Sequence, residues 1–134
     1  MDKLIISARR DSPEVILNSA EGLFSIKGIC HPENVTKFFE PVMAWLDEFE
    51  NEVTNNGYGK EFKVVLYFKY FNSATYKYLI SLLQKIQSIS QYAKTINVEW
   101  RFEREDEEMR EAGIELFEFS GMKIPYVCIE SDEL

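Results

Sequence analysis

Residues 62–73 read FKVVLYFKYFNS, the most strongly patterned stretch of the chain. One face of this extended run carries Phe62, Val64, Leu66, Phe68 and Tyr70. The opposite face is also largely apolar, because Val65, Tyr67 and Phe71 lie on it. A run that is apolar on both faces is typical of a central strand rather than an edge strand. We therefore expect a central strand over residues 62–71.

A helix is predicted directly after this strand. Asn72 and Ser73 break the apolar run, and apolar residues then recur at intervals of three and four. They are Tyr76, Leu79, Ile80, Leu83 and Ile86. The helix should cover residues 74–92, with Ser73 in the position of its N-cap.

The residues before this unit predict short strands and a long helix. Apolar runs at residues 3–8, 15–17 and 23–27 read as strands, and the turn residues between the last two predict a hairpin over 14–28. Apolar positions spaced at three and four predict a helix over residues 32–52.

Two local features should interrupt this part of the chain. Pro41 lies inside the long helix and should kink or divide it, because proline removes a helical hydrogen bond. Residues 55–60, NNGYGK, are read as a plain loop, since their glycine spacing does not match a phosphate-binding loop.

The remaining residues complete an α/β pattern. Residues 95–102 alternate and predict a strand, the acidic segment 103–118 should contain a short helix ending near Gly121, and residues 124–129 predict the last strand. Strands alternate with helices after the N-terminal hairpin. We therefore expect one domain over residues 1–134, a mixed sheet with two main helices and a short acidic helix.

Composition excludes several classes of function. The chain has 134 residues and a formal net charge of −8, which argues against general binding to nucleic acid. No apolar run approaches the length of a membrane helix, and residues 1–7 lack the basic start of a signal peptide, so we expect a cytoplasmic protein. Cys30, Cys128 and His31 have no zinc-type spacing, and we expect neither a metal nor a cofactor.

The strand–helix junction at residues 70–77 is the candidate site. A hydroxyl at a helix N-terminus is well placed to carry a phosphate, because free N–H groups and the helix dipole favour negative charge there. Ser73 is the first candidate and Thr75 the second, although Ser73 could serve only as an N-cap. The partner-binding residues expected around them are Asn72, Lys69, Lys77 and Tyr76.

Two charged segments leave alternatives open. The acidic segment can be a solvated face, a docking surface or a metal site, and a small enzyme would need a pocket that holds two of its carboxylates. The candidates are Glu105, Asp106, Glu107 and Glu108. Arg9 and Arg10 can form an exposed loop pair, or they can pair with carboxylates or a phosphate.

Several motifs together carry a family resemblance over most of the chain. They are DSPEV at 11–15, PEN at 32–34, FEPV at 39–42, LYFKYFNS at 66–73 and EDEEMREAG at 105–113. With these motifs the chain resembles the SiaC family of bacterial regulatory phosphoproteins. The Pro-Glu-Asn helix start and the Tyr-Phe-Asn-Ser junction are the most specific of them.

The resemblance implies a STAS-like fold and a protein switch rather than an enzyme. In the family, a dedicated kinase phosphorylates the hydroxyl residue after the asparagine, and a PP2C-like phosphatase reverses this. The unphosphorylated form binds and activates a diguanylate cyclase, which raises cyclic di-GMP and favours biofilm. The matching residue is Ser73; the family more often has Thr there followed by two serines, whereas this chain has Ala74 and Thr75, which keeps Thr75 open. A constitutive STAS-like binding module is the alternative.

Overall fold

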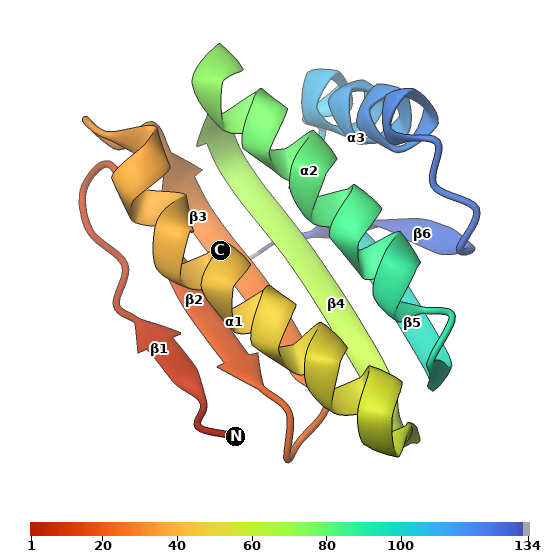
Figure 1. Cartoon of the computed structure of the whole chain (residues 1–134). Helices are drawn as coiled ribbons and strands as arrows, with labels where there is room; N and C mark the ends of the chain where they lie inside the picture. Colours follow the sequence, from red (N-terminus) through yellow and green to blue (C-terminus); the bar gives the residue numbers. More distant parts are fainter. Residues whose placement is uncertain (133–134) are drawn as a thin grey trace.

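The computed structural model describes residues 1–132 and consists of one six-stranded sheet with three helices packed on one of its faces (Figure 1). The strands are β1 (Leu4–Ile6), β2 (Glu14–Asn18), β3 (Leu23–Cys30), β4 (Tyr58–Phe71), β5 (Ala93–Glu103) and β6 (Tyr126–Ser131). The helices are α1 (Val35–Asn56), α2 (Ser73–Ile89) and α3 (Glu107–Ser120). No helix within residues 1–132 is long and apolar enough to span a bilayer.

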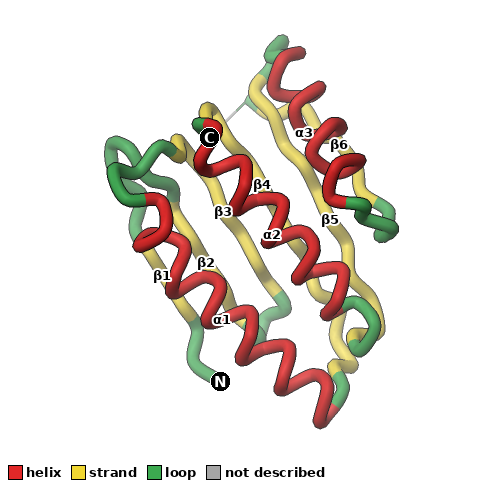
Figure 2. Tube along the Cα trace, turned by 45° about the horizontal axis from the view of Figure 1, so that its top comes forward, coloured by secondary structure: helices red, strands yellow, loops and turns green. Residues whose placement is uncertain are grey.

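The strands lie in the sheet in the same order as in the chain, β1-β2-β3-β4-β5-β6. The first three pair antiparallel, and β3 to β6 pair parallel. Each parallel pair is joined by one crossover helix, and such crossovers are right-handed. Because every crossover moves to the next strand in the same direction, all three helices lie on one face, and their N-termini lie at the edge where β3, β4 and β5 end (Figure 2). We call this edge the carboxyl edge.

The sequence predictions of fold class, hairpin and central strand are confirmed. β2 and β3 form the antiparallel hairpin, β4 lies between β3 and β5, and the acidic segment contains α3. The helix α3 ends at Gly121, whose φ of 72° is the left-handed conformation that glycine favours at a helix end.

The structure contradicts a division of α1 at Pro41 and a loop over residues 55–60. Pro41 does not divide the helix, since α1 runs without a break from Val35 to Asn56. Residues 55–60 are not a loop. Asn55 and Asn56 belong to α1, and only Gly57, at φ 72°, separates this helix from β4. A glycine in the left-handed region lets the chain turn within one residue.

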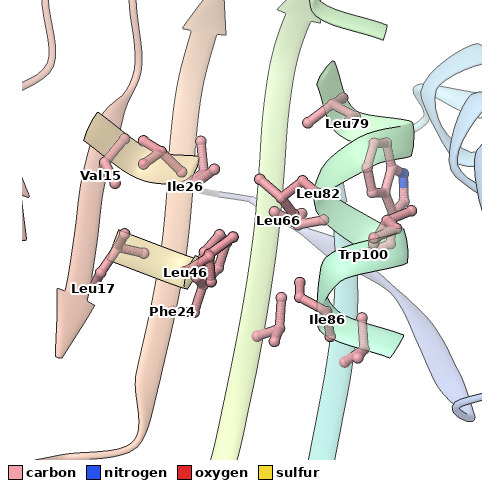
Figure 3. Close-up of a cluster of buried hydrophobic side chains, with 14 of the residues drawn as sticks. Val15, Leu17, Phe24, Ile26, Leu46, Leu66, Leu79, Leu82, Ile86 and Trp100 are labelled. Carbon is pink, nitrogen blue, oxygen red and sulfur yellow. The ribbon is translucent and has the colours of Figure 1, made fainter. Parts of the chain in front are cut away.

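The core lies between the helices and the sheet, and it is built from rows of side chains that cross the strands. One row consists of Leu17, Phe24, Val64 and Val98, and the next of Val15, Ile26, Leu66 and Trp100. All eight residues are buried. Figure 3 shows Leu46 from α1 and Leu79, Leu82 and Ile86 from α2 beside these rows. The strand register thus provides a continuous apolar surface on which the helices pack.

Trp100 is the point where α3 meets the sheet. Its indole Nε1–H donates to the carbonyl oxygen of Met109 at 3.0 Å, and the ring is fully buried. The α3 backbone approaches so closely that a Cβ on Gly113 would overlap the indole ring. Gly113 is therefore required by packing and not by backbone conformation.

Replacing Gly113 by alanine should destabilise the protein by about 1–3 kcal/mol, because an added methyl group forces the helix away from Trp100. Urea unfolding measures this change. The control is Gly59→Ala, because a Cβ at Gly59 meets nothing within 4 Å. Equal stability of the two variants would contradict the packing role.

A charged cluster, which we call the α1–α2 clasp, joins the two long helices. Lys85 of α2 lies 2.8 Å from Asp47 and 3.0 Å from Glu50 of α1. The Ser88 hydroxyl also donates to Glu50, at 2.5 Å. The Ser88 hydrogen bond, assisted by Lys85, holds the pKa of Glu50 below its usual value, and the two carboxylates raise the pKa of Lys85.

The clasp should make part of the stability depend on pH. The pKa of Glu50 is lowered by folding, so its contribution is present above the unfolded pKa of about 4.3 and is lost as the pH falls through the folded value. We expect Glu50→Gln to cost about 1 kcal/mol at pH 7, and less as the medium becomes acidic. Urea unfolding across pH 3–7 tests this, with exposed Glu48→Gln on the same helix as control. A cost independent of pH would contradict it.

Candidate functional site

Asn72 starts α2 at the carboxyl edge. Its backbone is extended, with φ −92° and ψ 174°, and its side-chain oxygen accepts the Thr75 backbone N–H at 2.9 Å. This is the hydrogen bond of an N-cap. The prediction that Ser73 is the N-cap was therefore wrong. β4 remains extended through Phe71, so the cap falls on Asn72 and Ser73 becomes the first residue of the helix.

The carbonyl oxygen of Cys30, at the end of β3, anchors this junction. It accepts the backbone N–H of Asn72 at 3.2 Å and the hydroxyl of Thr75 at 3.1 Å. The Thr75 hydroxyl also lies 3.4 Å from the Cys30 sulfur. Burial raises the pKa of the Cys30 thiol to about 11, so this cysteine remains a neutral packing residue.

The two hydroxyl candidates for phosphorylation differ sharply in access. Thr75 is fully buried, at 0% exposure, and its hydroxyl is engaged with Cys30. Ser73 is exposed at the surface of the first helical turn. Transfer of a phosphate to Thr75 would require the start of α2 to unfold from β3, whereas Ser73 is accessible in the folded protein.

The two lysines predicted as neighbours of Ser73 lie on different elements, β4 and α2. Lys69 is exposed and lies at an irregularity of the sheet, where Gly28 pairs with Phe68 and Ile29 with Tyr70. Lys77 is exposed one turn after Ser73, on the same side of the helix. Lys77 can therefore attract a negative group at this turn, whereas Lys69 follows the core residue Phe68 on β4 and so lies on the other face of the sheet.

Tyr76 is a different kind of neighbour, because its ring is half-buried. It lies parallel to the ring of Phe71, with 6.3 Å between the ring centroids. Burial, and then the carboxylate of Glu115 on α3, raise the pKa of Tyr76. The ring thus packs on Phe71, and only part of the side chain is available to a partner.

The sequence did not predict that Arg9 and Arg10 lie at this edge as well. They belong to the loop between β1 and β2, and the His31 backbone N–H donates to the Asp11 carbonyl of that loop at 2.9 Å. The two arginines, Asp11 and His31 line a shallow hollow. The position of these arginines could have been predicted from the antiparallel order of β1, β2 and β3, because that order brings the β1–β2 loop to the end of β3.

The acidic segment forms no pocket of paired carboxylates. Glu105, Glu107 and Glu108 are exposed, and the side chain of Asp106 accepts the Met109 backbone N–H as the N-cap of α3. Within residues 1–132, no group of three acidic, histidine or cysteine residues is arranged to hold a metal ion. The arrangement favours a solvated face over the small carboxylate enzyme.

Removing the Thr75 hydroxyl should destabilise the fold, whereas removing the Ser73 hydroxyl should not. We expect Thr75→Val to cost about 1 kcal/mol, because the Cys30 carbonyl loses a buried donor. Ser73→Ala is the matched control and should change the free energy of unfolding by less than about 0.5 kcal/mol. If urea unfolding gives the two variants equal losses in the free energy of unfolding, the structural difference between the two hydroxyls is contradicted.

Solved structures of SiaC from Pseudomonas aeruginosa have a similar fold. The chain superposes on the crystal structure of apo-SiaC from Pseudomonas aeruginosa with a TM-score of 0.81 and 21% identity, covering 96% of this chain and 99% of that one. It also matches a chain of the crystal structure of the diguanylate cyclase SiaD in complex with its activator SiaC, from the same organism. That match has a TM-score of 0.83 and 21% identity, and covers 96% and 99% of the two chains. At this identity the superpositions establish the fold.

Membership of a family follows from the sequence profile. No match to a curated protein reaches significance. The profile described as "SiaC family regulatory phosphoprotein" matches residues 6–128, which include the whole strand–helix junction. The chain therefore belongs to the SiaC family of regulatory phosphoproteins.

Proposed function

We propose that the chain is a phosphorylation-controlled protein switch and that Ser73 is its phosphate acceptor. A partner kinase adds the phosphate, a PP2C-like phosphatase removes it, and the unphosphorylated form binds and activates a diguanylate cyclase. The observation that supports Ser73 as the acceptor is its exposure, in contrast to the buried Thr75 two residues later on the same turn. The family is one of regulatory phosphoproteins and not of enzymes, which agrees with this proposal.

The cyclase partner is proposed from a structural relative. SiaC of Pseudomonas aeruginosa is the activator of the diguanylate cyclase SiaD and forms a complex with it. The fold that it shares with this chain covers nearly the full length of both. We place the switch in the cytoplasm, and the two cysteines, Cys30 and Cys128, are both free thiols.

The physical basis of the switch is local electrostatics. A phosphate on Ser73 adds about −1.5 to −2 charges at the N-terminus of α2, where the helix dipole stabilises negative charge. The domain should therefore remain folded while the charge of the carboxyl edge changes. A partner that docks on the start of α2 then contacts a dianion in place of a hydroxyl. Its binding becomes weaker, because the phosphate must be desolvated at the interface or repels the partner.

Phosphorylation by lysate of the native host with ATP should modify Ser73 and leave Thr75 bare. Trypsin releases residues 70–77 as one peptide, in which fragmentation distinguishes the two hydroxyls. In a binding assay with the cyclase of the same host, Ser73→Asp should weaken binding by about tenfold or more, and Ser73→Ala should bind like the wild type.

The matched control is Ser81→Asp, which adds the same charge at an exposed position two turns further along α2. It should bind normally if the effect is local to the helix start. Wild-type affinity of Ser73→Asp, together with an unmodified peptide, would contradict the switch and favour a constitutive binding module.

A further inference from the structure

We infer that Arg9 and Arg10, together with His31, form the binding site for the phosphate carried by Ser73, so that the arginine side chains turn toward the start of α2 after phosphorylation. This inference rests on the proposed function, which makes Ser73 the acceptor. It goes further by naming the groups that bind the phosphate. The ligand is a phosphomonoester dianion attached to the same chain.

The two arginines are free to bind an anion. Both are exposed, and no salt bridge within residues 1–132 engages either guanidinium group. The other three arginines of the chain, Arg101, Arg104 and Arg110, each form a salt bridge with a carboxylate. Arg9 and Arg10 instead line the open hollow with Asp11 and His31.

The hollow and the phosphate acceptor lie on the two sides of the end of β3, and adjacent residues of that strand end are hydrogen-bonded to both. The Cys30 carbonyl oxygen accepts the Asn72 backbone N–H at 3.2 Å, immediately before Ser73. The next residue, His31, donates its backbone N–H to the Asp11 carbonyl oxygen of the arginine loop at 2.9 Å. Two hydrogen bonds on consecutive residues thus connect the start of α2 to the arginine loop.

A ring contact continues this connection along the surface. The imidazole of His31 meets the ring of Tyr70 edge-on, with 5.6 Å between the centroids, and Tyr70 is half exposed. The loop is anchored by backbone bonds, including Arg9 N–H to the Ser12 carbonyl at 2.8 Å, and by the buried residues Ser12 and Pro13, whereas the side chains of both arginines are exposed. The arginine side chains therefore keep their freedom to turn toward Ser73.

The chemistry of these groups suits a phosphate monoester. Arginine presents parallel N–H donors that bind two phosphate oxygens at once, and such charge-assisted pairs are stronger than neutral hydrogen bonds. Lys77, one turn after Ser73, adds a further cation. The acidic residues at the carboxyl edge are Asp11, Glu33 and residues 105–108 at the start of α3, so the arginines bind the phosphate in competition with these carboxylates.

The test places phosphoserine at position 73 of the full chain by genetic encoding and measures the phosphate by ³¹P NMR. The second pKa of the phosphate should lie below its ordinary value of about 6 in the otherwise unchanged chain. In R9Q/R10Q it should rise by about half a unit or more, a threefold change in proton affinity. The control K94Q/K123Q removes two exposed lysines at the opposite edge of the sheet and should leave the pKa unchanged.

Amide NMR spectra establish that each variant is folded, and the side-chain Nε–H signals of the two arginines give a second readout. These signals should shift when Ser73 carries phosphate. Equal phosphate pKa values in R9Q/R10Q and the parent, with unmoved arginine signals, would overturn the inference. Equal arginine shifts on adding inorganic phosphate to the unmodified chain would also overturn it, because the hollow would then be a general anion site.

This experiment is independent of the kinase and of the cyclase, because the phosphoserine is encoded directly. A failure of the proposed function would appear as an unmodified Ser73 in the host or as unchanged cyclase binding. A failure of the present inference would appear only in the phosphate pKa and the arginine signals.

Discussion

The sequential order of the strands is the constraint on which the rest of the structure depends. Since each parallel crossover steps to the neighbouring strand in the same direction, right-handedness places α1, α2 and α3 on one face. The same constraint collects the helix N-termini and the ends of the parallel strands at one edge. A hydroxyl residue that follows a strand and opens a helix must therefore lie at this edge, where backbone donors are unpaired and a partner can reach them.

The junction shows how one backbone carbonyl separates two similar side chains. The Cys30 carbonyl oxygen accepts hydrogen bonds from the backbone N–H of Asn72 and from the hydroxyl of Thr75. These two bonds fix the rotation of the first turn of α2 about the helix axis. In that rotation Thr75 faces inward and Ser73 faces outward. Accessibility, the property that a modifying enzyme requires, is thus set by where a neighbouring strand ends.

The sequence predicts the parts of this protein that have strong periodicity. The central strand, α2 and the hairpin follow from apolar alternation and helical spacing, which act within a few residues. The N-cap could not be assigned to Asn72, because Asn and Ser are both favoured caps and the choice depends on the distant Cys30 carbonyl. The neighbourhood of Arg9 and Arg10 also depends on strand order, which no local pattern contains.

The strand order has a further consequence, for the way the chain assembles as it leaves the ribosome. Every strand after the first pairs with the strand made just before it, so no gap must be kept open for a segment synthesised later. Each new helix and strand can dock on the growing edge of the sheet. The nascent sheet therefore presents one growing edge at a time, which limits the opportunity for mispairing between chains.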